Sequence, residues 1–128
     1  MIAGVGVDVC EVARMEEIIR DGRFLTRYFA PEEQSYIADK GKCAAQTAAG
    51  LFAAKEALVK ALGTGFVTGK LSEICVLHDL HGAPYYDLRG EMAQHTAQRN
   101  IDCLHLSISH DGGVAVAFCV AERTAGGR

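Results

Sequence analysis

The chain has 128 residues, of which 49% are hydrophobic and 23% charged, so it has the length and composition of one globular domain rather than two. Its formal net charge of −3 argues against nucleic acid as a partner, because no basic excess is present to neutralise phosphates. No apolar run approaches the roughly 20 residues that a membrane-spanning helix needs, so we expect no membrane span.

The cysteines indicate a reducing compartment. They form an odd set of five without a Cys-x-x-Cys pair, and each lies in an apolar or helical context, as free thiols do. The N-terminal segment lacks the basic stretch of a signal peptide and has the pattern of a strand. We therefore expect a cytoplasmic protein.

Residues 2–9 alternate in character and predict a β-strand whose two faces differ. One face carries two glycines and a carboxylate, from Gly4, Gly6 and Asp8. The other face carries the valines Val5, Val7 and Val9. Glycine inside a strand indicates that another group approaches closely. Asp8 is thus expected at the end of a face cleared of side chains.

Helical patterns follow this strand. Apolar spacing predicts a helix from about residue 11 that ends at Asp21-Gly22, and Ala30-Pro31 predicts the start of a second, short helix. An alanine-rich helix is expected over residues 42–62, with Gly63 as its stop. Small residues of this kind allow close packing against a sheet or a neighbouring subunit.

The second half of the chain predicts mainly strands. Residues 74–77 and 84–88 are two strands joined by a polar turn, and residues 91–99 form a short amphipathic helix. Residues 104–110 and 114–120 alternate around Asp-Gly-Gly, which is the best hairpin signal in the chain. We expect a single domain over residues 1–123, followed by a frayed tail at residues 124–128.

Glu56 and Lys60 share one face of the long helix because they are four residues apart, whereas Lys55 points elsewhere. Such a pair is usually a surface ion pair worth a few tenths of a kcal/mol. Next to the glycine turn, however, a carboxylate and an ammonium group also suit a site that handles a metal ion and a phosphate. Asp8 supplies a second carboxylate from far upstream.

Three blocks in a fixed order carry a resemblance to a known family. They are Gly-Val-Asp-Val-Cys-Glu at 6–11, Phe-Ala-Ala-Lys-Glu-Ala-Leu-Val-Lys-Ala-Leu-Gly-Thr-Gly at 52–65 and Leu-Ser-Ile-Ser-His-Asp at 106–111. Together with His81-Gly-Ala-Pro84, they closely resemble the holo-acyl carrier protein synthases, the small bacterial phosphopantetheinyl transferases. The resemblance extends from Ile2 to Glu122.

The resemblance implies that the 4'-phosphopantetheine group of coenzyme A is transferred to a serine of an apo-acyl carrier protein, from fatty acid or polyketide synthesis. The other product is adenosine 3',5'-bisphosphate. Asp8 and Glu56 would bind Mg²⁺, which prefers a few carboxylates together with phosphate oxygens and water. The glycine-cleared face beside Asp8 is expected to leave room for hydrated metal and pyrophosphate. Glu56 and Lys60 would be catalytic; the serine proton goes either to Glu56 or to a water held by the metal.

The resemblance also implies which residues bind coenzyme A: Lys42, Lys60, Gly63, Thr64, Gly65 and His110. One departure concerns Leu51, because the family usually has arginine immediately before Phe-Ala-Ala-Lys-Glu. Lys40 and Lys42 still provide basic groups at the start of the long helix, where the 3'-phosphate of coenzyme A is commonly held.

The implied fold is α+β, with an antiparallel sheet packed against the long helix, and the implied assembly is a homotrimer with each active site at a subunit interface. Arg14, Met15 and Arg20 would form the docking face for the acidic carrier protein. Two other hypotheses stay open. A coenzyme A or carrier-protein binding module without catalysis is favoured by Leu51 and opposed by the presence of Asp8, Glu56 and Lys60, and a purely structural trimeric domain would bind neither Mg²⁺ nor coenzyme A.

Overall fold

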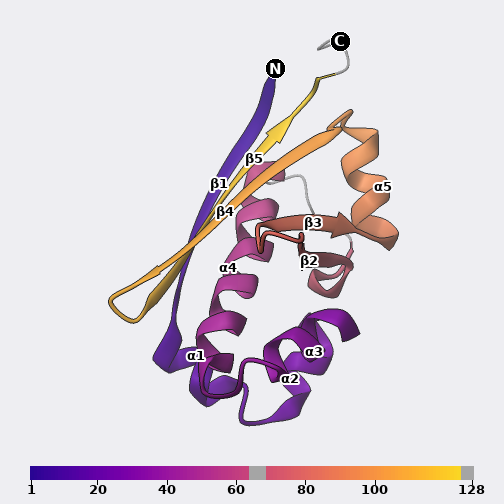
Figure 1. The fold of residues 1–128 in the computed structure, drawn as a ribbon. Coiled ribbons are helices and arrows are strands. Elements are labelled where there is room, and N and C mark those ends of the chain that lie inside the picture. Colours follow the sequence, from indigo (N-terminus) through magenta and orange to yellow (C-terminus); the bar gives the residue numbers. More distant parts are fainter. Residues whose placement is uncertain (64–68, 125–128) are drawn as a thin grey trace.

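The computed structural model of the chain describes residues 1–63 and 69–124, which form an α+β fold (Figure 1). Its strands are β1 (Ile2–Glu11), β2 (Ile74–His78), β3 (Pro84–Leu88), β4 (Cys103–Asp111) and β5 (Val114–Glu122). Its α-helices are α1 (Val12–Ile18), α2 (Gly22–Tyr28), α3 (Pro31–Ala38), α4 (Ala44–Leu62) and α5 (Gly90–Gln98). Short 3₁₀ turns, η1 (Gly41–Cys43) and η2 (Leu71–Glu73), precede α4 and β2.

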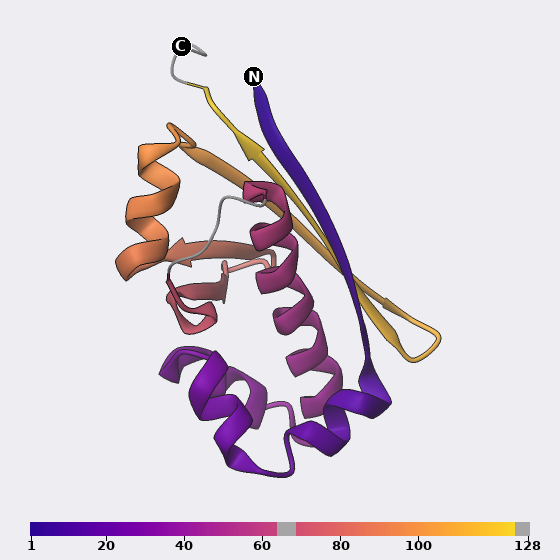
Figure 2. The same cartoon turned by 180° about the vertical axis from the view of Figure 1, so that it is seen from behind.

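The strands form two antiparallel sheets on either side of α4. The larger sheet has the order β1-β5-β4, and the smaller sheet pairs β2 with β3. Helix α4 packs against β1 and β5 on one side and faces the smaller sheet and α3 on the other (Figure 2). The predicted antiparallel sheet against a long helix is therefore confirmed.

Glycines on β1 allow α4 to pack very closely against the sheet. A Cβ atom at Gly4 would overlap the carbonyl oxygen of Ala61, and one at Gly6 would overlap that of Ala57. The space cleared by these glycines is thus filled by the backbone of α4. The expectation that it accommodates hydrated metal and pyrophosphate is wrong.

Two local predictions need correction. The segment after Asp21-Gly22 is helical, because the carboxylate of Asp21 accepts a hydrogen bond from the backbone N–H of Arg23 at 3.0 Å and caps α2. Thr124 is not frayed, because its backbone N–H and its hydroxyl each donate to the carboxylate of Asp102 at 2.8 Å. Residues 125–128 lie outside the described part of the chain.

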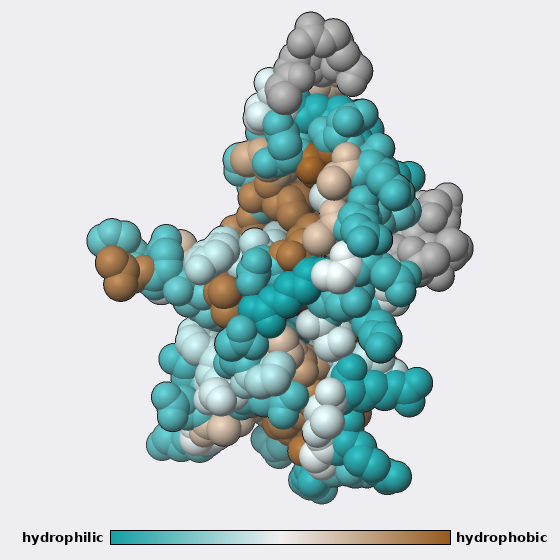
Figure 3. Space-filling model, turned by 90° about the vertical axis from the view of Figure 1, so that its right-hand side faces the viewer, coloured by the Kyte–Doolittle hydropathy of each residue, from teal (hydrophilic) through white to brown (hydrophobic). Residues whose placement is uncertain are grey.

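The outer face of the larger sheet is apolar and is not covered by any element among the described residues. Val5, Val7 and Val9 on β1 and Phe118 on β5 are each about half-exposed there. The alanines of α4, by contrast, are buried in the chain's own core. The side of the molecule that carries α5 is mostly hydrophilic, with hydrophobic residues gathered in its upper part (Figure 3).

Candidate active site

Strand β1 and helix α4 bring Asp8 and Lys60 together. Asp8 follows Gly4 and Gly6 on the face of β1 that meets α4, and Lys60 lies in the last turn of that helix. The ammonium nitrogen of Lys60 is 3.0 Å from a carboxylate oxygen of Asp8, and it also donates to the carbonyl of Val7 at 3.1 Å. Residues 52 positions apart in the sequence therefore meet, as the proposed site requires.

Glu56 lies one helical turn before Lys60 and joins the same charged group. Partial burial raises the pKa of its carboxyl, the negative charge of Asp8 raises it further, and the positive charge of Lys60 opposes both. Lys60 forms its ion pair with Asp8, and not the i, i+4 surface ion pair with Glu56 that the spacing along the helix suggested. Within residues 1–63 and 69–124, no basic side chain forms an ion pair with Glu56. Two carboxylates with one lysine leave an unbalanced negative charge that suits a cation.

A pocket of about 280 Å³ opens beside Asp8, between β1 and the helices α1, α2 and α4. Its walls combine apolar side chains with a few charged ones: Asp8, Val9, Cys10, Glu11, Arg14, Met15, Ile18, Phe24 and Phe52. Such a mixture is typical of sites that bind an organic group and orient it by a few polar contacts.

A second pocket, of about 180 Å³, brings together several residues that the sequence motifs singled out: Leu51, Gly82, Pro84 and His110. The Nε2 atom of His110 donates to the backbone carbonyl of Gln46 at 3.1 Å. Tyr36 also lines this pocket, and the ammonium group of Lys40 lies 4.5 Å from its ring centroid. A positive charge is thus present at the edge of this pocket.

The two pockets are separate within one chain. Asp8 pairs with Ala117, which pairs with Ile108, so β5 lies between the strand of Asp8 and the strand of His110. Along α4, the rise of about 1.5 Å per residue places Gln46 about 15 Å from Glu56. The structure therefore brings together Asp8, Glu56 and Lys60 but leaves His110 apart from them.

The other residues expected to bind coenzyme A have varied positions. Gly63 ends α4 as predicted, with a φ of 84° that favours glycine and its N–H bonded to the carbonyl of Lys60 at 3.1 Å. Lys42 is exposed on η1. Thr64 and Gly65 lie outside the described residues.

The predicted docking face is only partly compatible with the structure. Arg14 and Arg20 are exposed, but Met15 has 1% of its surface exposed and belongs to the core beneath α1. Met15 therefore cannot offer a docking surface, and that prediction is wrong.

Sequence reasoning missed a buried ion pair next to the site. The ammonium group of Lys55 lies 2.7 Å from the carboxylate of Glu33 and also donates to the carbonyls of Leu71 and Ile74. The backbone N–H groups of Ala30 and Val76 donate to the same carboxylate at 2.9 Å each. The sequence did offer one indication of this ion pair. Lys55 lies among small apolar residues of α4, which indicates a buried lysine that needs a partner.

Comparison with known proteins assigns the family. The family model of the 4'-phosphopantetheinyl transferase superfamily matches residues 4–119. The holo-[acyl-carrier-protein] synthase of Treponema denticola is 39% identical over 122 residues, which cover 95% of this chain and 99% of the relative.

Solved structures agree with this assignment. The crystal structure of holo-[acyl-carrier-protein] synthase from Neisseria meningitidis superposes with a TM-score of 0.86 and 31% identity, covering 95% of this chain and 99% of that one. The Helicobacter pylori synthase in complex with coenzyme A superposes with a TM-score of 0.79 and 33% sequence identity. The match covers 92% of this chain and 99% of that one. The chain belongs to the holo-[acyl-carrier-protein] synthase family and is a phosphopantetheinyl transferase.

Proposed function

We propose that this protein transfers the 4'-phosphopantetheine group of coenzyme A to a serine of an apo-acyl carrier protein in a Mg²⁺-dependent reaction. The serine oxygen forms a bond to the phosphorus that carries the pantetheine arm, and the bond between the two phosphates of the donor breaks. Adenosine 3',5'-bisphosphate leaves. The observation that carries the proposal is the meeting of Asp8, Glu56 and Lys60 in a member of this family.

The residues present fit a magnesium ion. Asp8 and Glu56 repel each other, and this repulsion contributes to the raised pKa of Glu56. Both carboxylates keep some exposure, so water and phosphate oxygens can share the ion with them, which is the ligand set that Mg²⁺ prefers. When bound, the ion supplies positive charge that neutralises the pyrophosphate of coenzyme A.

Lys60 and Glu56 have separate tasks in this proposal. The ammonium group of Lys60 is held next to Asp8 while 56% of its side chain stays exposed, so it can also neutralise charge on the transferred group. Glu56 takes the proton of the serine hydroxyl. Among the described residues no basic side chain forms an ion pair with its carboxylate, so an oxygen is available to accept that proton.

We also propose that three chains assemble and that each active site combines the Asp8 pocket of one protomer with the His110 pocket of its neighbour. Two facts support this: the pockets are separate within one chain, and the outer face of the larger sheet leaves half-exposed valines uncovered. The described residues contain no helix that could cross a membrane. All five cysteines are free thiols, which supports a cytoplasmic location.

The transfer reaction is tested by mass spectrometry of an apo-acyl carrier protein incubated with this protein, coenzyme A and Mg²⁺. The carrier should gain one phosphopantetheine group, and a chelator of divalent ions should abolish the gain. Glu56→Gln should slow transfer by about 10²- to 10³-fold, the effect typical of losing a group that acts on the transition state. Glu91→Gln, which changes an exposed carboxylate on α5, is the matched control and should keep full activity. Full turnover by Glu56→Gln would contradict the proposal.

The trimer is tested by light scattering on the eluting protein. The wild-type mass should be three times that of the chain, and Val7→Asp should reduce it to that of a single chain, because a buried unpaired charge is costly. Leu80→Asp alters a fully exposed apolar residue in the β2–β3 turn and should leave the trimer intact. A monomeric wild-type protein, or an intact Val7→Asp trimer, would refute the assembly.

A further inference from the structure

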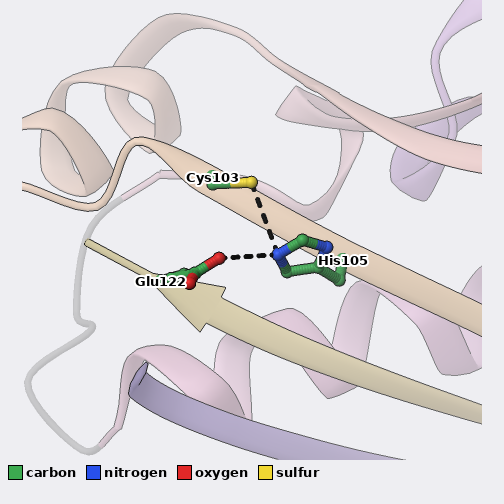
Figure 4. A group of neighbouring side chains, drawn as sticks. All are labelled: Cys103, His105 and Glu122. Carbon is green, nitrogen blue, oxygen red and sulfur yellow. Dashed lines mark hydrogen bonds and ion pairs between the residues drawn. The ribbon is translucent and has the colours of Figure 1, made fainter. Parts of the chain in front are cut away.

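A cluster of three potential metal ligands lies on the larger sheet, away from the active site. Cys103 and His105 come from β4 and Glu122 from the end of β5 (Figure 4). The Nε2 atom of His105 is 3.4 Å from the sulfur of Cys103 and 2.9 Å from a carboxylate oxygen of Glu122. The three ligand atoms all lie within 4.8 Å of one another.

The strand pairing holds these side chains on one face. Cys103 and Glu122 are direct cross-strand partners, and His105 is two residues from Cys103, so all three point to the same side of the sheet. The β4–β5 ladder therefore fixes their backbones before any ligand arrives. All three ligand atoms already lie within 4.8 Å of one another, so side-chain rotation alone has to bring them around an ion.

The donor atoms select the kind of metal. Tetrahedral zinc with Zn–S of about 2.3 Å and Zn–N and Zn–O of about 2.0–2.1 Å requires ligand atoms separated by roughly 3.3–3.6 Å. The contact at 3.4 Å matches these values, the contact at 2.9 Å is somewhat shorter, and the third pair lies within 4.8 Å. Sulfur and imidazole suit Zn²⁺, whereas Mg²⁺ takes oxygen ligands only, so this cluster has a different preference from the pair of carboxylates at Asp8.

The cluster is also remote from the active site. Glu122 lies five positions beyond Ala117, the cross-strand partner of Asp8, which corresponds to about 17 Å along a strand. His105 and Glu122 remain partly exposed, with 56% and 31% of their side chains accessible. The cluster lies on the same outer face as Val5, because His105 pairs with Val120 and Val120 with Val5. In the single chain an ion can enter from solvent, and in the proposed trimer it would be bound before or during assembly of that face.

We propose that Cys103, His105 and Glu122 bind a zinc ion, with a water molecule as the fourth ligand. Binding releases the thiol proton of Cys103 to solvent, because the thiolate is the ligand. The ion would tie the start of β4 to the end of β5, close to where the chain enters and leaves the sheet. It would stabilise the folded chain and take no part in phosphopantetheine transfer.

The first experiment titrates Zn²⁺ into the full-length, metal-stripped protein in competition with a zinc-sensitive dye. We expect about one zinc ion per chain with tight binding. Cys103→Ser should weaken binding by more than about 100-fold, since loss of a direct ligand should exceed the 10- to 100-fold cost of losing a supporting contact. Cys43→Ser removes an exposed thiol on η1, outside the cluster, and should bind zinc as the wild type does. Absence of binding by the wild type, or unchanged binding by Cys103→Ser, would overturn the proposal.

The second experiment uses the wild-type protein only, so it does not depend on the folding of a variant. Alkylation of each cysteine by iodoacetamide is followed by peptide mass spectrometry with and without Zn²⁺. Zinc should slow the modification of Cys103 at least about tenfold and leave that of Cys43 unchanged, because a metal-bound thiolate is shielded from the reagent. Equal rates at Cys103 with and without zinc would refute the site.

Discussion

Lys55 and Glu56 are sequence neighbours on α4, but the charge of Lys55 has an oppositely charged partner inside the fold, whereas Glu56 forms no such ion pair among the described residues. Lys55 is completely buried, and its ammonium group is bonded to the carboxylate of Glu33 and to two backbone carbonyls. Burial lowers its pKa, and the charge of Glu33 opposes that shift. Glu56, by contrast, is partly exposed, and its nearest charged influences include a second carboxylate, Asp8.

This contrast separates a structural charge from a functional one. All three ammonium protons of Lys55 are used inside the fold, and three N–H groups donate to the carboxylate of Glu33, so this buried pair is satisfied without a ligand. The carboxylates of Asp8 and Glu56 retain capacity and repel each other, so the site gains by accepting a cation. Substitutions of Lys55, Lys60 and Glu56 test that difference, from the largest expected effect on stability to the smallest.

Replacing Lys55 should have the largest effect on stability. Lys55→Met leaves the carboxylate of Glu33 buried without its cation, and breaking a buried ion pair costs about 3–5 kcal/mol. Urea unfolding should show this loss. The double variant Glu33→Gln, Lys55→Met should recover part of it, because the unpaired charge is gone. A loss below about 1 kcal/mol in Lys55→Met would show that the pair does not hold the fold.

Replacing Lys60 should cost much less stability, although it also breaks an ion pair with a carboxylate. The pair with Asp8 is accessible to solvent, so Lys60→Met should change the free energy of unfolding by no more than about 1 kcal/mol. The rate of phosphopantetheine transfer by Lys60→Met should nevertheless fall about 10²-fold, since one electrostatic contact to the reacting phosphate is lost. A stability loss equal to that of Lys55→Met would remove the distinction between the two lysines.

Glu56→Gln should leave stability unchanged or slightly increased at neutral pH. The folded-state pKa of Glu56 lies above its ordinary value of 4.5, so ionised Glu56 disfavours the folded state at pH values above that raised pKa. The penalty disappears as the pH falls below 4.5, where the carboxyl is protonated in both states. Solvent screening keeps the gain below about 1 kcal/mol.

Urea unfolding without Mg²⁺ at pH 7 and below pH 4.5 measures this effect. The advantage of Glu56→Gln over the wild type should be present at the higher pH and absent at the lower. A variant that is less stable at pH 7 would show that the Glu56 carboxylate holds the fold together and is not reserved for a ligand.

Much of the fold follows from periodicity in the sequence. Alternation predicted β1 as a strand and the residues around the Asp-Gly-Gly turn as a hairpin, and the alanine-rich run predicted α4 with its stop at Gly63. Sequence motifs also named Asp8, Glu56 and Lys60, which the fold brings together.

Other features depend on contacts between distant segments and could not be predicted locally. The pairing of Glu33 with Lys55 arises only when α3 packs beside α4, so neither residue's local sequence names its partner. The glycines of β1 correctly indicated a close approach, but the approaching group is α4. Met15 shows a conflict within the sequence itself, because its apolar helical spacing indicated burial while the docking prediction required exposure.

The convergence of Asp8 and Glu56 on one divalent cation is tested most directly by Mn²⁺ binding, followed by electron paramagnetic resonance with coenzyme A present. Mn²⁺ takes the same oxygen ligands as Mg²⁺ and can be counted when free. Asp8→Asn and Glu56→Gln should each weaken binding at least about tenfold, whereas Glu91→Gln should bind as the wild type does. Binding that is unaffected by either Asp8→Asn or Glu56→Gln would show that the two carboxylates do not share an ion.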